Sequence, residues 1–264
     1  IENRLITRSI EKAQTRVEGH HFDARKHLLE YDDVLNKHRE IIYARRSEVL
    51  EVFAHRQEEL RVRVLDVIEG EVEQMVLFHS SQAGEDGTWD MEAIVEGVET
   101  IVTLDDEQKR RLREIPIASL DDKEDQAKHR LAVIASIMEM CRQQYADLSD
   151  LFEEAASLYQ IERGVILRAI DILWIDHLAA MSALRTGIGL RGYGQRDPLI
   201  EYKKEGFQMF QHLLGSINHE IAHSFFKVAK HAVDMRVQME LGRSVFQKAG
   251  IVLQGAQKTS NGSS

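Results

Sequence analysis

Proline is almost absent from this chain, and this absence restricts the possible folds more than any other feature. Only Pro116 and Pro198 occur in 264 residues, so no proline interrupts a helix before Pro116. Charged residues make up 30% of the chain and hydrophobic residues 43%, a balance that favours long helices with charged outer faces. One stripe of apolar residues has the spacing of a single helical face: Leu28, Tyr31, Leu35, Ile42, Val49 and Val52. The sequence therefore predicts an all-α fold.

The first half of the chain predicts one short helix followed by a very long one. We expect a helix over residues 1–18, a break near Gly19, and a helix from about residue 23 to the high sixties. The region from 70 to 160 predicts several shorter helices, with Thr103 and Ser119 as hydroxyl caps of two of them. The small, polar residues from 254 onward predict a flexible tail.

Two strongly periodic segments flank a glycine-rich stretch, residues 186–198. The stripe before the stretch consists of Leu167, Ile170, Trp174, Leu178, Met181 and Leu184. The stripe after it consists of Phe207, Phe210, Leu214, Ile217, Ile221, Phe225 and Val228. Two amphipathic helices joined by a short polar connection form an antiparallel hairpin whose apolar stripes face each other. Gly187 or Gly189 suits the end of the first helix, and Asp197 with Pro198 suits the start of the second.

The glycine-rich stretch also matches the dinucleotide-binding pattern G-x-G-x-x-G at Gly187, Gly189 and Gly192. That pattern binds a pyrophosphate where a strand ends in a tight turn and a helix begins. Here a helical segment precedes the glycines and no strand-like run lies nearby, so we reject a nucleotide site. Tyr193 lies between two glycines, and the sequence leaves two positions for its ring: folded back onto the hairpin, or exposed to a partner.

The sequence predicts no catalytic residue, no cofactor site and no metal site. Cys141 is the only cysteine, which excludes an internal disulfide and a cysteine-rich zinc site. Asp176 and His177 fall in the middle of a helix, so we expect His177 to be packed or salt-bridged rather than catalytic. The net charge of -10 argues against nucleic-acid binding. No apolar run of 18 residues occurs, so we expect no membrane-spanning helix.

Several segments closely resemble SecA, the family of motors that drive bacterial preprotein translocation. The resemblance is carried by residues 173–181 (Leu-Trp-Ile-Asp-His-Leu-Ala-Ala-Met) and 184–198 (Leu-Arg-Thr-Gly-Ile-Gly-Leu-Arg-Gly-Tyr-Gly-Gln-Arg-Asp-Pro). Residues 201–210 continue it, as do residues 13–19 and 22–34 near the start of the chain. It covers about residues 1–68 and 155–230, whereas the middle segment is similar only in its position and helical character.

The resemblance implies a division of the chain into four parts. Residues 1–68 correspond to the first part of a helical scaffold, and residues 69–160 to a helical wing. Residues 161–232 correspond to a two-helix finger with a returning scaffold helix, and residues 233–264 to a C-terminal helix and linker tail. In the family the finger tip contacts the translocating polypeptide and the channel. The corresponding residues here are Leu190, Arg191, Gly192, Tyr193, Gly194, Gln195 and Arg196.

The resemblance also implies partners, cofactors and a location. The expected partners are a preprotein polypeptide, the SecYEG channel, the upstream motor domains of the same protein and acidic phospholipid. The family hydrolyses ATP with magnesium, but its nucleotide-binding motifs are not in this sequence, so we expect no cofactor in this segment. The cysteine-rich zinc tail of many members is also missing. The expected location is the cytoplasm, in peripheral association with the inner membrane. The alternative function is a stand-alone helical scaffold that binds a partner without a role in transport.

Overall fold

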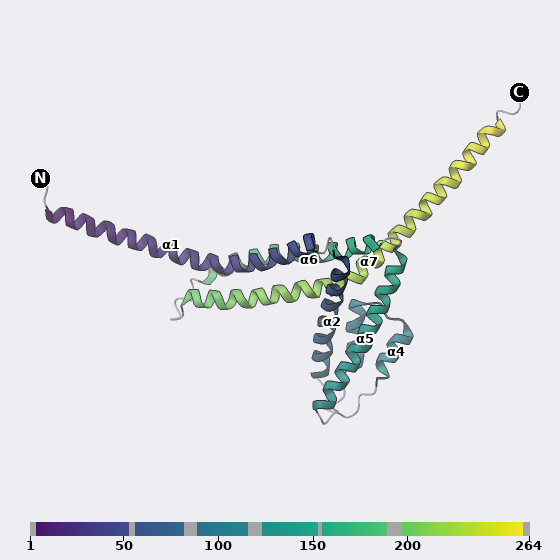
Figure 1. Cartoon of the computed structure of the whole chain (residues 1–264), viewed down its shortest axis with the longest axis horizontal. Coiled ribbons are helices and arrows are strands. Elements are labelled where there is room, and N and C mark those ends of the chain that lie inside the picture. The colour runs from purple at the N-terminus through teal and green to yellow at the C-terminus, as the bar shows by residue number, and fades with distance from the viewer. Residues whose placement is uncertain are drawn as a thin grey trace. The chain divides into compact units, whose positions relative to one another are not determined.

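The computed structural model describes residues 4–52, 56–81, 89–115, 123–152, 155–188 and 197–260, and within these ranges every regular element is helical. Figure 1 shows them in chain order: α1 (Arg4–Ser47), the π-helical turn η1 (Glu48–Val52), α2 (Gln57–Ser81), α3 (Met91–Ile101), α4 (Asp106–Arg113), α5 (Lys123–Leu151), α6 (Ala155–Ile188) and α7 (Pro198–Ser260). The predicted all-α fold is confirmed for the described part of the chain.

The helices belong to two compact units. Unit 1 comprises Ile1–Ala54 and Leu167–Ile217, and unit 2 comprises His55–Ile166 and Asn218–Ser264. Helices α6 and α7 each contribute residues to both units, because both unit boundaries on them fall inside a helix. The four-part division expected from the sequence remains a prediction.

Helix α1 differs from the sequence prediction at both of its ends. It begins at Arg4 and continues through Gly19 without a break, and it ends at Ser47 in the π-helical turn instead of reaching the high sixties. An isolated glycine costs a helix only about 1 kcal/mol relative to alanine, and extending an existing helix avoids the cost of a second nucleus. The expected break and the expected uninterrupted helix are therefore both wrong.

Unit 2 is built around α2 and α5, which lie side by side, with α3 and α4 packed near them (Figure 1). In its core the rings of Tyr145 on α5 and Phe225 on α7 stack with centroids 5.7 Å apart, and the Arg61 guanidinium lies 4.7 Å from the centre of the Tyr145 ring. The Tyr145 hydroxyl donates a hydrogen bond to the buried carboxyl of Glu162. Burial raises the pKa of Glu162 to about 7. The core therefore contains a buried carboxyl group that accepts a hydrogen bond from a tyrosine hydroxyl.

The short helices of unit 2 begin at aspartate caps. The Asp105 side chain accepts a hydrogen bond from the Gln108 amide, and the Gln108 side chain accepts one from the Asp105 amide, so α4 starts with a full capping box. Thr103, the cap expected from the sequence, is thus two residues too early. A carboxylate also interacts favourably with the positive end of the helix dipole, which a hydroxyl does not. Ser119, the other expected cap, lies outside the described residues.

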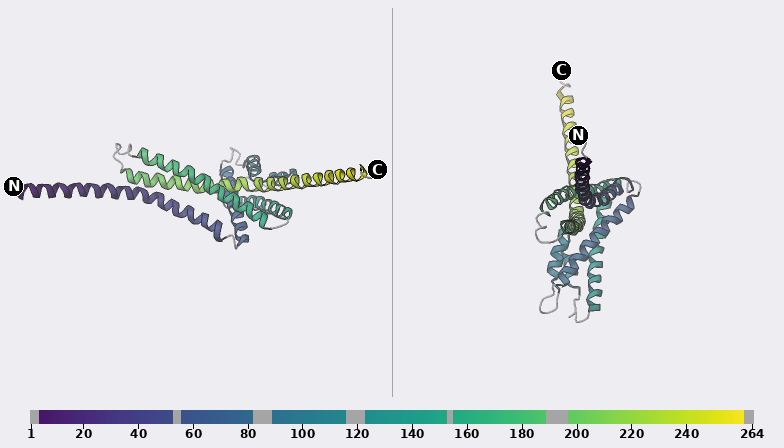
Figure 2. Two further views of the ribbon diagram at one scale, coloured as in Figure 1. Left: turned by 90° about the horizontal axis from the view of Figure 1, so that it is seen from above. Right: turned by 90° about the vertical axis from the view of Figure 1, so that its left-hand side faces the viewer.

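Helix α7 is the longest of the described elements, with 63 residues, and Figure 2 shows it running towards the C-terminal end of the chain. It continues to Ser260, so most of the expected polar tail is helical. Alanine, glutamine and lysine in this segment are compatible with a helix, and an existing helix extends without a new nucleus. Among the described residues, no helix combines the length and hydropathy that crossing a membrane would require.

Candidate functional site

The sequence-predicted hairpin forms the centre of unit 1, where α6 and α7 pack against the second half of α1. We call this three-helix assembly the helical arm; it comprises residues 28–47 of α1, 167–188 of α6 and 198–217 of α7. Met181, Ile188 and Tyr202 form one buried core cluster of the arm, and five partly buried residues pack against them: Tyr31, Val34, Leu35, Leu184 and Met209. The predicted hairpin is confirmed by this shared core, to which both helices contribute.

The two hairpin helices lie close together at Gly206. A Cβ atom on Gly206 would lie 3.2 Å from the Met181 Cε atom and 3.2 Å from the Val34 Cγ1 atom, on α6 and α1 respectively. The rings of Tyr31 and Tyr202 lie 4.8 Å apart one turn away, so aromatic packing continues the contact. A residue without a side chain therefore lets α7 contact both of its neighbours at this point.

The start of α7 follows the prediction, and the end of α6 excludes one of the two glycines that were expected to end it. The Asp197 side chain accepts a hydrogen bond from the Leu199 amide at 2.8 Å, and Pro198 is the first helical residue. Gly187 lies inside α6 and does not end it, because the helix continues to Ile188. Gly189 and all seven predicted contact residues (Leu190, Arg191, Gly192, Tyr193, Gly194, Gln195 and Arg196) lie outside the described residues.

Two ion pairs join α1 to α6 along the arm. The Arg185 guanidinium lies 2.8 Å from the Asp32 carboxylate, and the Arg46 guanidinium lies 2.9 Å from the Asp171 carboxylate. All four side chains are partly exposed, so each pair contributes at most about 1 kcal/mol. Their main effect is on the axial alignment of the two helices, because each pair forms at only one register.

The middle of the arm contains a buried pair of histidines. His38 of α1 and His177 of α6 share one hydrogen bond, with their Nδ1 and Nε2 atoms 3.2 Å apart. The ring of Phe210 stacks on His38 with centroids 4.2 Å apart, and Trp174 stacks on His177. Burial and the neighbouring His177 lower the pKa of His38 to about 4, and burial also lowers the pKa of His177. His177 is thus a packed histidine, as the sequence predicts.

The histidine pair makes the stability of the arm depend on pH. The unfolded chain binds a proton at His38 below about pH 6.5, whereas the folded chain does so only near pH 4, so stability falls as the pH drops through this window. Between pH 7.5 and pH 5 we expect the free energy of unfolding to fall by about 2 kcal/mol on account of His38. Urea unfolding followed by Trp174 fluorescence, with Trp89 replaced by phenylalanine, measures this loss.

Two variants test the assignment of this pH dependence to His38. We expect His38→Gln to reduce the loss of stability between pH 7.5 and pH 5 by about 2 kcal/mol, whatever it does to stability at pH 7.5. His212→Gln changes an exposed histidine of the same arm and should keep the wild-type difference. If the His38→Gln protein showed the wild-type pH profile, the buried pair would not be its source.

A groove of about 450 Å³ lies between α1 and α7 on the surface of the arm. Phe207 and Ile41 line it and are exposed, although the periodicity of the sequence predicts Phe207 in the buried stripe. That prediction is wrong because Gly206, one position earlier, occupies the buried face. The rim carries both signs of charge, from Asp33, Lys37 and Lys203 among others. The groove is therefore an accessible apolar surface with a charged border.

One further cluster lies in unit 2 and was not predicted from the sequence. His219, Glu220 and His223 fit the pattern H-E-x-x-H, in which two histidines one helical turn apart can bind one metal ion. The structure places Glu71 of α2 beside both histidines. The spacing of the two histidines was the signal present in the sequence, and the carboxylate that completes the group comes from a position far away in the chain.

Comparisons with known proteins agree with this architecture. A family model described as the SecA Wing and Scaffold domain matches residues 1–229. A SecA protein translocase subunit from Dehalococcoides mccartyi is 37% identical over 228 residues, which cover 86% of this chain and 22% of that protein. The subunit from Heliobacterium modesticaldum is 39% identical over 228 residues, covering 86% of this chain and 25% of that protein. The subunit from a Roseiflexus species is 37% identical over 258 residues, which cover 95% of this chain and 24% of that protein.

The matched region has two features that bear on its assignment. The chain spans about a quarter of the length of these curated relatives. The family match covers α1 to α6 and the first half of α7, which includes the whole helical arm and most of unit 2. By its sequence and its all-helical structure, the chain belongs to the SecA family and corresponds to its wing and scaffold region.

Proposed function

We propose that this chain forms the scaffold, wing and two-helix finger of a protein translocase, and that the finger contacts the preprotein and the SecYEG channel during ATP-driven export. The observation that carries the proposal is the helical arm, in which α6 and α7 form a hairpin braced by α1. The described ends of the hairpin, Ile188 and Asp197, bracket the segment that contains Tyr193. The relatives are named as protein translocase subunits, which supports the same role.

The proposed mechanism assigns no catalysis to this chain. A hairpin with a shared buried core moves as one body, so a displacement at its base reaches the 189–196 segment with little loss. A tyrosine offers a broad apolar face and one hydroxyl, which suits contact with unfolded chains of varied sequence. Each contact must be weak, because the polypeptide has to move on. ATP hydrolysis would belong to other domains of the translocase, and the chain would act in peripheral association with the inner membrane.

A substitution at Tyr193 tests this role. In a complete translocase that carries this sequence, we expect Tyr193→Ala to reduce preprotein transport into vesicles at least tenfold while basal ATP hydrolysis changes less than twofold. Tyr193→Phe keeps the aromatic face and should retain most of the transport. Equal and large losses of transport and basal ATP hydrolysis in Tyr193→Ala would contradict the proposal and indicate a role in folding instead.

The groove between α1 and α7 favours a second candidate, a scaffold that binds a partner without a role in transport. Its exposed Phe207 and Ile41 could pack against an amphipathic helix, and its mixed rim charges could pair with either sign. A photo-crosslinking residue placed at position 193 or at position 207 distinguishes the two functions. Crosslinks to preprotein from position 193 support the translocase finger, whereas crosslinks only from position 207 support the second candidate.

A further inference from the structure

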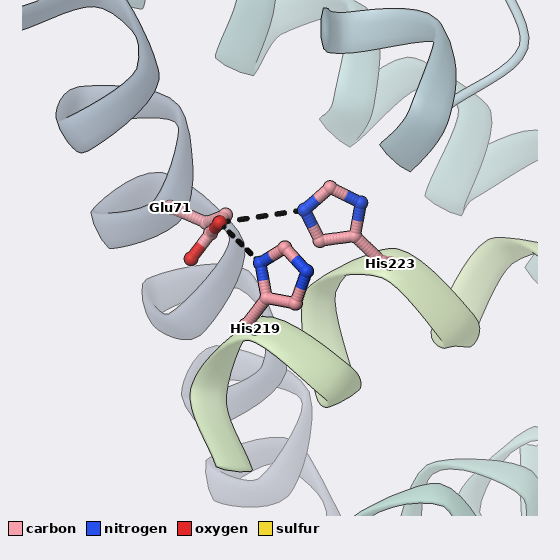
Figure 3. Close-up of side chains that lie close together, drawn as sticks. All are labelled: Glu71, His219 and His223. Atoms are coloured by element: carbon pink, nitrogen blue, oxygen red, sulfur yellow. Dashed lines mark hydrogen bonds and ion pairs between the residues drawn. The ribbon is translucent and has the colours of Figure 1, made fainter. Parts of the chain in front are cut away.

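Three side chains of unit 2 converge in a way that the proposed transport function does not explain. Figure 3 shows Glu71 of α2 facing His219 and His223 of α7. The His219 Nδ1 atom lies 2.7 Å from Glu71 Oε1, and the His223 Nε2 atom lies 3.3 Å from the same oxygen. The two imidazole rings lie against each other, with centroids 3.9 Å apart. One carboxylate oxygen is thus shared by two ring nitrogens.

Hydrogen bonds on the far side of His223 determine which of its nitrogens carries a proton. The Thr100 hydroxyl lies 2.6 Å from the Gly97 carbonyl oxygen, and it must donate there because a carbonyl oxygen can only accept. The His223 Nδ1 atom lies 2.9 Å from the Thr100 oxygen, so His223 donates its Nδ1 proton to that oxygen. In the neutral ring, the Nε2 atom then presents a lone pair to Glu71.

This arrangement leaves two electron-rich atoms facing each other. The lone pair of His223 Nε2 and the carboxylate of Glu71 are 3.3 Å apart, and they repel each other unless one of the two groups is protonated or a metal cation binds to both. The hydrogen bond from the far nitrogen to a fixed oxygen is also the contact that orients metal-binding histidines in proteins.

We propose that Glu71, His219 and His223 bind a divalent transition-metal ion of the zinc class. The ligand atoms would be Glu71 Oε1, His219 Nδ1 and His223 Nε2. Each of the three residues offers a ligand atom that lies within 4.8 Å of those of the other two. Tetrahedral zinc with bonds of about 2.0–2.1 Å separates its ligand atoms by about 3.3 Å. The 3.3 Å distance from His223 Nε2 to Glu71 Oε1 matches this value, and the 2.7 Å distance from His219 Nδ1 to the same oxygen would lengthen when an ion binds. Imidazole and carboxylate together suit zinc, copper or nickel better than calcium or magnesium.

The site is suited to binding rather than to peptide hydrolysis. Glu220, the residue that a zinc peptidase would use as its base, is exposed and does not belong to the group of mutually close ligand atoms. The ion would instead connect α2 to α7, and Thr100 would extend that connection to α3, all within unit 2. The positive charge of Lys227 acts on His223 and would also repel a metal cation. We therefore expect a lower affinity for zinc than at a site with only acidic neighbours.

The experiment uses the 264-residue chain without a polyhistidine tag, stripped of metal with a chelator. We expect isothermal titration with zinc to give one ion per chain, and the melting temperature to rise with zinc. Glu71→Gln and His219→Gln should each weaken zinc binding at least tenfold. His231→Gln, which changes an exposed histidine two turns further along α7, should bind as the wild type does. Absence of zinc binding by the wild type, or equal binding by all four proteins, would overturn the proposal.

A second pair of variants tests the orientation of His223 without touching a ligand. Thr100 is exposed, so neither Thr100→Val nor Thr100→Ser should disturb folding, which circular dichroism in the presence of chelator verifies. Thr100→Val removes the oxygen that accepts from Nδ1 and should weaken zinc binding about 10- to 100-fold. Thr100→Ser keeps the oxygen and should bind nearly as well as the wild type. Wild-type affinity in Thr100→Val would refute Nε2 as the ligand atom.

Discussion

Replacing Tyr202 with alanine should lower the free energy of unfolding of the helical arm by about 3–5 kcal/mol. Tyr202 is only 2% exposed, shares the core with Met181 and Ile188, and packs its ring against Tyr31. Alanine would leave a cavity between three helices whose backbones are held by other contacts and cannot close it fully. Urea unfolding followed by Trp174 fluorescence would show the loss as a lower midpoint.

Two controls separate this effect from a general loss of aromatic surface. Tyr202→Phe keeps the ring and should cost less than about 1.5 kcal/mol. Phe207→Ala removes a ring of similar size from the same helix, but that ring is 61% exposed, so the cost should stay near about 0.5 kcal/mol. Similar losses in Tyr202→Ala and Phe207→Ala would show that the buried core does not determine the stability of the arm.

Replacing Gly206 with valine should destabilise the arm by about 3 kcal/mol, through crowding rather than through a cavity. The Cβ atom alone would already lie 3.2 Å from atoms of Met181 and Val34. The Met181 side chain can rotate away, but Val34 is branched at Cβ and has few alternative rotamers. The two methyl groups of valine would then push α7 away from α1. The expected result is a lower urea midpoint together with increased hydrogen exchange in α7 beside position 206.

Gly215 provides the matched control, because it lies in the same helix and the same unit. A Cβ atom on Gly215 would have no neighbour within 4 Å. Gly215→Ala should therefore stabilise the arm by about 0.5–1 kcal/mol, through the higher helix propensity of alanine. If Gly206→Val were as stable as the wild type, the close approach of the three helices would not hold in solution.

The hairpin could be predicted from the sequence because each of its helices is marked by a repeat of apolar residues within its own segment. The stripe from Ile170 through Trp174 to Met181 repeats at the helical period, and all three residues are buried. The predicted second stripe starts one position too late, because a search for large apolar residues selects Phe207 over Gly206. A glycine belongs to a buried face when another helix approaches closely, and only the tertiary structure shows such an approach.

The ends of the helices were less predictable, because several small contributions to the free energy of the helix compete there. At Gly19 the cost of one glycine is smaller than the cost of starting a new helix, so α1 continues. Between Thr103 and Asp105 both side chains could cap a helix, and the partner three residues later decides, since only Asp105 has Gln108 in that position. Such choices depend on differences of about 1 kcal/mol.

Only the histidines of the proposed metal site could be predicted from the sequence. His219 and His223 are four positions apart in the chain, so their approach on one helical face follows from the sequence alone. Glu71 and Thr100, in contrast, come from two other helices, and nothing in their own surroundings marks them as neighbours of a histidine pair. The histidine pair of the arm poses the same difficulty, because His38 and His177 meet across 139 positions of the chain.

The continuity of α6 and α7 across the two units has a mechanical consequence. Most domains are joined by loops, whose free dihedral angles absorb rotation, but here two of the connections are turns of hydrogen-bonded helix. Bending or twisting either connection would therefore strain backbone hydrogen bonds of α6 or α7, which a loop connection does not have.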